Sequence, residues 1–130
     1  MKYTVLIADD EPNVIELIES MLDGDATRIV GRASDGVAAL ALTQEKHPEI
    51  LITDIRMPGY NGLELIQQVR QISPATEIIV ISGYREFEYL QTILKYGITE
   101  FILKPIDKQD LDRAVHNVIK HKKEISSQYQ

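Results

Sequence analysis

Residues Ile50-Leu51-Ile52-Thr53-Asp54 are the most informative about the fold of this chain. It begins with consecutive large apolar residues, and the run Ile78-Ile79-Val80-Ile81 repeats the pattern. A strand with one face in water alternates apolar and polar residues, whereas a strand covered on both faces does not alternate. The two runs therefore predict central strands of a parallel sheet that carries helices on both faces.

Similar short runs occur on either side of this stretch, and segments of helical period separate them. The predicted strands cover residues 4–8, 28–33, 50–53, 77–81 and 100–103. Between them, apolar residues recur every three or four positions, as in Val14, Ile18 and Met21, which is typical of helices laid on a sheet. Five such βα units predict an α/β fold, a flavodoxin-like (βα)5 open parallel sheet of strand order 2-1-3-4-5.

Length and composition indicate one globular domain. The chain has 130 residues, of which 44% are hydrophobic and 26% charged, and no cysteine, so disulfides and thiol nucleophiles are excluded. The net charge of −6 disfavours direct binding of nucleic acid. Because the first apolar run is too short for a signal peptide or a membrane span, we expect a cytoplasmic protein without membrane contact. We assign residues 1–122 to the domain and residues 123–130 to a polar tail or the start of a linker.

Polar side chains follow four of the predicted strands at the point where each strand ends. They are Asp9 and Asp10 after the first strand, Asp54 after the third, Ser82 after the fourth and Lys104 after the fifth. Open parallel sheets bind ligands outside the carboxyl ends of their strands. In the predicted order these four strands are neighbours, so the side chains should share one cleft.

Three carboxylates in one cleft would repel one another unless a cation neutralises them. Carboxylate oxygens with room for water favour Mg²⁺, and a carboxylate beside Mg²⁺ is well placed to attack phosphorus. Asp54 is the best candidate nucleophile because its strand lies between the acidic pair and the Ser82/Lys104 pair. Lys104 and Ser82 would then supply positive charge and a hydrogen-bond donor to phosphoryl oxygens.

Four segments together resemble the motif set of the receiver domains of bacterial two-component response regulators. They are Asp9-Asp10-Glu11-Pro12, Asp54-Ile55-Arg56-Met57-Pro58-Gly59, Ser82-Gly83-Tyr84 and Lys104-Pro105, and the resemblance covers about residues 3–120. It implies that a sensor histidine kinase phosphorylates Asp54 and that the chain is a phosphoacceptor and not a conventional enzyme. It also implies Mg²⁺ held by Asp10, Asp54 and the backbone carbonyl of Arg56, with Asp9 acting through water, and a cis Lys104–Pro105 bond.

The resemblance also implies a switch. Ser82 would move toward the new phosphate, Phe101 would change rotamer, and the surface formed by the fourth helix, fifth strand and fifth helix would be remodelled. This surface is a possible homodimer face. Arg56 and Tyr84 flank the path of an attacking water and would tune the lifetime of the phosphoaspartate.

The run at residues 82–89 looks most like receivers fused to AraC-type DNA-binding output domains, which implies control of transcription by a longer protein. Three other functions stay open. A phosphorylation-independent, receiver-like interaction module would leave Asp54 unlabelled. A haloacid-dehalogenase-type phosphatase would turn over phosphate esters, and a flavin or nucleotide module would need a phosphate-binding loop where this chain has acids.

Overall fold

The computed structural model describes residues 2–59, 62–83, 91 and 94–128. Five strands form one sheet: β1 (Tyr3–Ala8), β2 (Thr27–Ala33), β3 (Ile50–Asp54), β4 (Glu77–Ser82) and β5 (Glu100–Leu103). The helices of the described residues are α1 (Pro12–Met21), α2 (Gly36–Lys46), α3 (Gly62–Ile72) and α5 (Lys108–Gln128). Tyr84 and most of the fourth predicted helix, including Phe87 and Leu90, lie outside the described residues.

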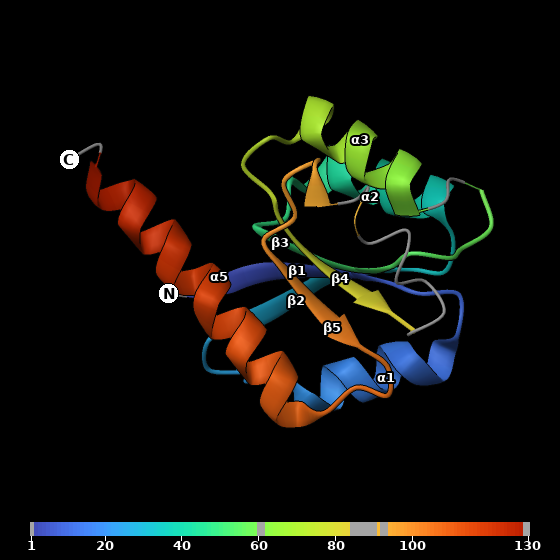
Figure 1. Ribbon diagram of the computed structural model, residues 1–130, viewed down its shortest axis with the longest axis horizontal. Coiled ribbons are helices and arrows are strands. Elements are labelled where there is room, and N and C mark those ends of the chain that lie inside the picture. The colour runs from blue at the N-terminus through green and yellow to red at the C-terminus, as the bar shows by residue number, and fades with distance from the viewer. Residues whose placement is uncertain (1, 60–61, 84–90, 92–93, 129–130) are drawn as a thin grey trace.

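The strand order is β2-β1-β3-β4-β5 and every neighbouring pair is parallel, which confirms the predicted topology. The sequence placed the five strands correctly to within one residue at each end. In Figure 1, α2 and α3 cover one face of the sheet while α1 and α5 cover the other. The three-layer α/β fold is thus the predicted one.

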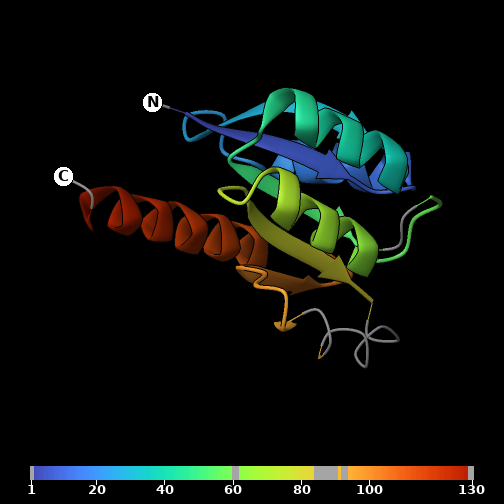
Figure 2. The ribbon, with the colours of Figure 1, turned by 90° about the horizontal axis from the view of Figure 1, so that it is seen from above.

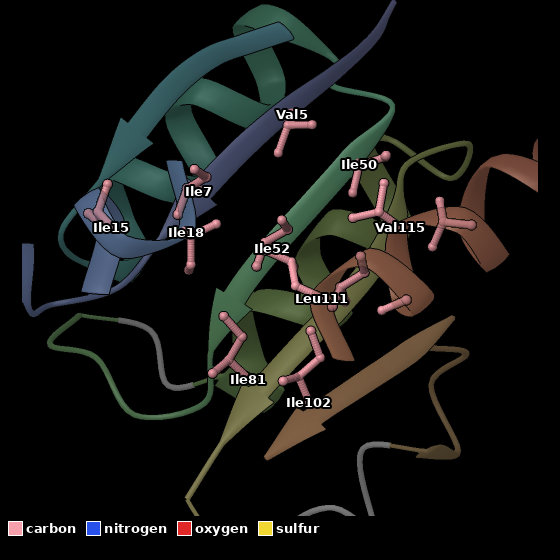
Figure 3. Packing of buried hydrophobic residues seen from close by; sticks show 13 residues of the cluster. Val5, Ile7, Ile15, Ile18, Ile50, Ile52, Ile81, Ile102, Leu111 and Val115 are labelled. Carbon is pink, nitrogen blue, oxygen red and sulfur yellow. The ribbon is translucent and has the colours of Figure 1, made fainter. Parts of the chain in front are cut away.

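Each face of the sheet has its own hydrophobic core because successive side chains of a strand point to opposite faces. Ile7, Ile52 and Ile81 pack against α1 and α5 (Figure 3), whereas Leu6, Leu51 and Val80 belong to the cluster beneath α2 and α3. These side chains are almost fully buried. Burial of each one stabilises the fold by about 1.5–3 kcal/mol, which explains why β3 and β4 lack alternation.

The helix boundaries follow from local chemistry. Pro12 occupies the start of α1, where its missing amide hydrogen is not needed. Asp35 caps α2, since its Oδ1 accepts a hydrogen bond of 2.7 Å from the amide of Ala38. This cap fixes the start of α2 at Gly36.

The last helix, α5, extends past the edge of the sheet (Figure 2). Its buried residues end at Val118, and the helix continues through residues 123–128, which the sequence indicated only as a polar tail or linker. Among the helices of the described residues, none is both long and apolar enough for a bilayer span.

Candidate functional site

The sheet register brings the predicted site residues to one edge. Thr53 pairs with Ala8, Asp54 with Ile81, and Ser82 with Leu103, so β1, β3, β4 and β5 end at nearly the same level. The residues at and just beyond these ends are Asp9, Asp10, Asp54, Ser82 and Lys104. Residues up to ninety-five positions apart in sequence (9 to 104) therefore meet in one place because parallel strands place their carboxyl ends together.

Asp54 is buried and held by contacts to both carboxylate oxygens. Its Oδ1 accepts a hydrogen bond of 2.7 Å from the amide of Ile55, and the amide of Arg56 lies farther away at 3.4 Å. Its Oδ2 accepts a hydrogen bond of 3.0 Å from Lys104 Nζ. Thr53 fixes the backbone at this point because its Oγ1 donates to the carbonyl of Asp54 at 2.9 Å. The carboxylate is thus positioned before any ligand binds.

The two adjacent acids after β1 differ sharply in burial. Asp9 is fully buried, whereas Asp10 is exposed. Burial is the largest effect and raises the pKa of the Asp9 carboxyl, and the charge of Asp54 raises it further. The hydrogen bond from the amide of Glu11 and the ammonium of Lys104 act in the opposite direction. The resemblance implied different roles for these neighbours, but nothing in the sequence predicted that one is buried and the other exposed.

The acidic cluster fits a bound cation. Carboxylate oxygens of Asp9, Asp10 and Asp54 lie within 4.8 Å of one another. Within the described part of the chain, Asp9 Oδ2 accepts no hydrogen bond, although Lys104 Nζ lies 3.3 Å away as an ion-pair partner. A buried carboxylate oxygen without a hydrogen bond is unfavourable in isolation, so the cluster has unmet capacity for a hard divalent ion.

Lys104 connects the acidic cluster to the end of β5. Burial disfavours its ammonium, but the hydrogen bond and charge of Asp54, together with the charge of Asp9, outweigh this effect and raise the pKa of Lys104. Its amide donates to the carbonyl of Ser82 at 2.8 Å, which continues the β4–β5 pairing. The Lys104–Pro105 bond is cis, as the resemblance predicted.

Ser82 and Phe101, the two predicted switch residues, lie on adjacent strands. Ser82 is buried, and its Oγ donates to the carbonyl of Gly83 at 2.9 Å. Phe101 is partly buried on β5, where it pairs with Val80. Arg56 is exposed in the loop that follows β3.

The loop after β3 depends on a glycine whose role the sequence did not reveal. Gly62 packs directly on the backbone of Ile55, and a Cβ at this position would lie 2.5 Å from Ile55 Cα. The amide of Gly62 also donates to the carbonyl of Ile55. The close approach of these two backbones, which only glycine allows, is visible only in the folded chain.

Comparisons with known proteins agree with this architecture. Residues 5–116 match the sequence family described as the response regulator receiver domain. The transcriptional regulatory protein YesN of Bacillus subtilis strain 168, itself described as uncharacterized, is 36% identical over 119 residues, which are 90% of this chain and 32% of YesN. HptR, a transcriptional regulatory protein of Staphylococcus aureus, is 33% identical over 128 residues, which are 97% of this chain and 50% of HptR. The matched part of this chain thus spans about a third to a half of the length of these relatives.

Solved structures give the same picture. The REC domain of AraT, a response regulator from Geobacillus stearothermophilus, superimposes with a TM-score of 0.86 at 34% identity and covers 100% of both chains. The isolated REC domain of RcsB from Salmonella enterica, solved with the phosphomimetic BeF3-, gives a TM-score of 0.85 at 29% identity over 92% of this chain and 90% of the other.

Proposed function

Because this chain belongs to the response regulator receiver domain family, we propose that Asp54 is its phosphoacceptor and that a sensor histidine kinase is the phosphoryl donor. The observation that carries this proposal is the arrangement of Asp54 itself. Its carboxylate is buried at the end of a central strand, with Lys104 Nζ 3.0 Å away and two further acids beside it. A nucleophile, a cationic group and a cluster suited to a metal ion therefore meet at one point.

Mg²⁺ is the proposed cofactor, with Asp10 and Asp54 as direct ligands, the backbone carbonyl of Arg56 as a third, and Asp9 acting through water. The burial of Asp9 and the exposure of Asp10 support this division, since the exposed carboxylate can reach an ion at the surface of the cleft. When bound, Mg²⁺ would neutralise the phosphoryl oxygens that carry charge during transfer.

The residues of the chain would perform the remaining steps. A carboxylate oxygen of Asp54 attacks phosphorus, the bond from phosphorus to the donor nitrogen breaks, and the donor histidine keeps that electron pair. Lys104 then moves its contact from Asp54 Oδ2 to the phosphoryl oxygens, where its charge stabilises the product. Ser82 would exchange its hydrogen bond to Gly83 for one to the phosphate, and Phe101 would change rotamer behind it. The domain is thus a phosphoacceptor that assists its own modification, and not a conventional enzyme.

The output is proposed to be transcriptional. Relatives that are two to three times longer than the matched segment are named transcriptional regulatory proteins, and a two component transcriptional regulator AraC from Clostridium phytofermentans gives a TM-score of 0.80 at 28% identity. We therefore assign residues 1–122 to the receiver and residues 123–130 to a connection toward an AraC-type DNA-binding domain. The surface that includes β5 and α5 would form the phosphorylation-dependent homodimer face, and Arg56 and Tyr84 would tune the lifetime of the phosphate. A cytoplasmic location fits this role.

Intact-mass spectrometry after incubation with acetyl phosphate tests the central step. The native chain should gain a phosphoryl adduct in the presence of Mg²⁺ and much less of it in EDTA, and Asp54→Ala should gain none. Asp10→Ala is the matched control for loss of one acid, because it should slow labelling without removing the acceptor. If the native chain stays unlabelled while a control receiver labels, the domain is a phosphorylation-independent interaction module.

A further inference from the structure

Far from the acidic cluster, Arg70 at the end of α3 connects two separate loops. Its Nη1 donates to the carbonyls of Thr76 at 2.7 Å and Pro74 at 3.3 Å, both in the loop before β4. Its Nη2 donates to the carbonyl of Gly97 at 2.7 Å and its Nε to that of Tyr96 at 3.3 Å, both in the loop before β5. One side chain therefore joins the starts of two adjacent strands.

The chemistry of this bridge requires a guanidinium. Arg70 is partly buried, and burial lowers the pKa of its guanidinium while the charge of Glu77 opposes the shift. A guanidinium presents its N–H groups in a planar fork that can address two loops at once, whereas a lysine ammonium donates from a single point. Hydrogen bonds from a charged donor to carbonyls are also stronger than those from a neutral donor.

The loop before β5 depends on this bridge at a specific place. Gly97 has a φ of +78°, a left-handed conformation, and its amide donates a long hydrogen bond of 3.4 Å to the carbonyl of Leu94. The strand pairing then begins two residues later, where the amide of Thr99 donates to the carbonyl of Ile78 at 2.8 Å. Arg70 thus anchors this loop just before the β4–β5 pairing begins.

The same loop lies at one end of the connection between β4 and β5. The other end of this connection is Ser82, beside Asp54, and β5 itself carries Phe101 before it reaches Lys104. A displacement that starts at Ser82 passes to β5 through the strand pairing, where the amide of Lys104 donates to the carbonyl of Ser82. It changes β5 itself, and does not merely shift the strand, when the loop at the start of β5 stays in place. If the loop at residues 94–97 is not held, the loop moves with the strand and the conformation of β5 does not change.

We propose that Arg70 is a positioning residue for the switch, which anchors residues 94–97 to the body of the domain so that phosphorylation at Asp54 is transmitted to β5. The inference rests on the proposed phosphorylation. Arg70 acts through the loop carbonyls of Tyr96 and Gly97 and touches neither Asp54 nor the acidic cluster.

Hydrogen exchange with mass spectrometry tests this inference on the native chain, Arg70→Gln and Arg70→Lys, each with Mg²⁺ alone and with Mg²⁺ and beryllofluoride. Without the analogue, both variants should exchange amide hydrogens of residues 94–99 at least about tenfold faster, because charged hydrogen bonds are lost. With the analogue, the native chain should change its exchange at both Ser82 and residues 94–103. The variants should respond only at Ser82 and should still label at Asp54.

Arg32→Gln is the matched control, since Arg32 is exposed on β2, at the opposite edge of the sheet from β5, and makes an ion pair with Glu19. It should keep the native response. A native-like response of β5 in Arg70→Gln would overturn the inference, and so would a native-like response in Arg70→Lys. Either result would mean that a guanidinium bonded to both loops is not needed. If Arg70→Gln fails to fold, the hydrogen exchange of β5 in Arg70→Lys tests the inference instead. An absent response in the native chain would instead refute the proposed phosphorylation, and the inference with it.

Discussion

Lys104 Nζ lies 3.0 Å from Asp54 Oδ2, so the residue that directly follows β5 neutralises a carboxylate at the end of β3. The same ammonium lies 3.3 Å from Asp9 Oδ2. A lysine therefore supplies the positive charge that the acidic cluster needs when no metal ion is bound. Metal binding and the contacts of Lys104 should consequently depend on each other.

Lys104→Met should destabilise the Mg²⁺-free protein by about 1–3 kcal/mol, because two buried or partly buried carboxylates lose their cationic partner. Saturating Mg²⁺ should recover more stability in this variant than in the native chain, since the metal then provides the missing charge. Urea unfolding in EDTA and in Mg²⁺ measures both effects. Equal stability of the two proteins in EDTA would contradict the role given to Lys104.

Asp9→Asn and Asp10→Asn should have different effects on stability although the residues are adjacent. In EDTA, Asp9→Asn should raise the free energy of unfolding by about 1 kcal/mol, because it removes a buried charge while keeping the acceptor for the amide of Glu11. Asp10→Asn should change it little, since Asp10 is exposed. Both should weaken Mg²⁺ binding by about tenfold or more in a titration followed by thermal stability. Similar stability changes in EDTA would argue against the different burial of these acids.

Gly62→Ala should lower the free energy of unfolding by about 1–3 kcal/mol, because the added Cβ would collide with the backbone of Ile55. The clash involves main-chain atoms, which cannot rotate away as a side chain does. Gly24→Ala is the control, since a Cβ there has nothing within 4 Å. Urea denaturation should show a clear shift for the first variant and almost none for the second.

The stability contributed by Lys122 should depend on pH in the alkaline range. Burial lowers the pKa of its ammonium, while Glu77 and Glu49 oppose the shift and Arg70 adds to it. The charged form is therefore disfavoured in the folded state below the lowered pKa, and this disadvantage disappears as the pH rises past the unfolded value of 10.5. The native chain should accordingly gain stability relative to Lys122→Met between neutral pH and about pH 10.5. Chemical unfolding at several pH values measures this change, with Lys123→Met as the control for removing an exposed lysine. A loss of stability of the native chain relative to Lys122→Met over this pH range would contradict the prediction.

The sequence by itself determined the topology and the membership of the acidic site. Runs such as Ile50-Leu51-Ile52 lack alternation because both faces of their strands are covered, and this pattern is local and readable. Once the strand order is known, residues that follow strand ends must converge, so Asp9, Asp54 and Lys104 could be grouped without coordinates. Tyr84 and the fourth helix remain predictions.

The different burial of adjacent residues and the contacts between distant loops are visible only in the folded chain. Asp9 and Asp10 are chemically identical in sequence, yet the turn after β1 buries one and exposes the other. The periodicity of the sequence did not predict two further contacts either. They are the hydrogen bond from Arg70 to Gly97 and the contact of Gly62 with Ile55. Such features depend on how whole elements pack against one another, and a pattern along one element cannot carry that information, because burial and pairing are properties of the assembled layers.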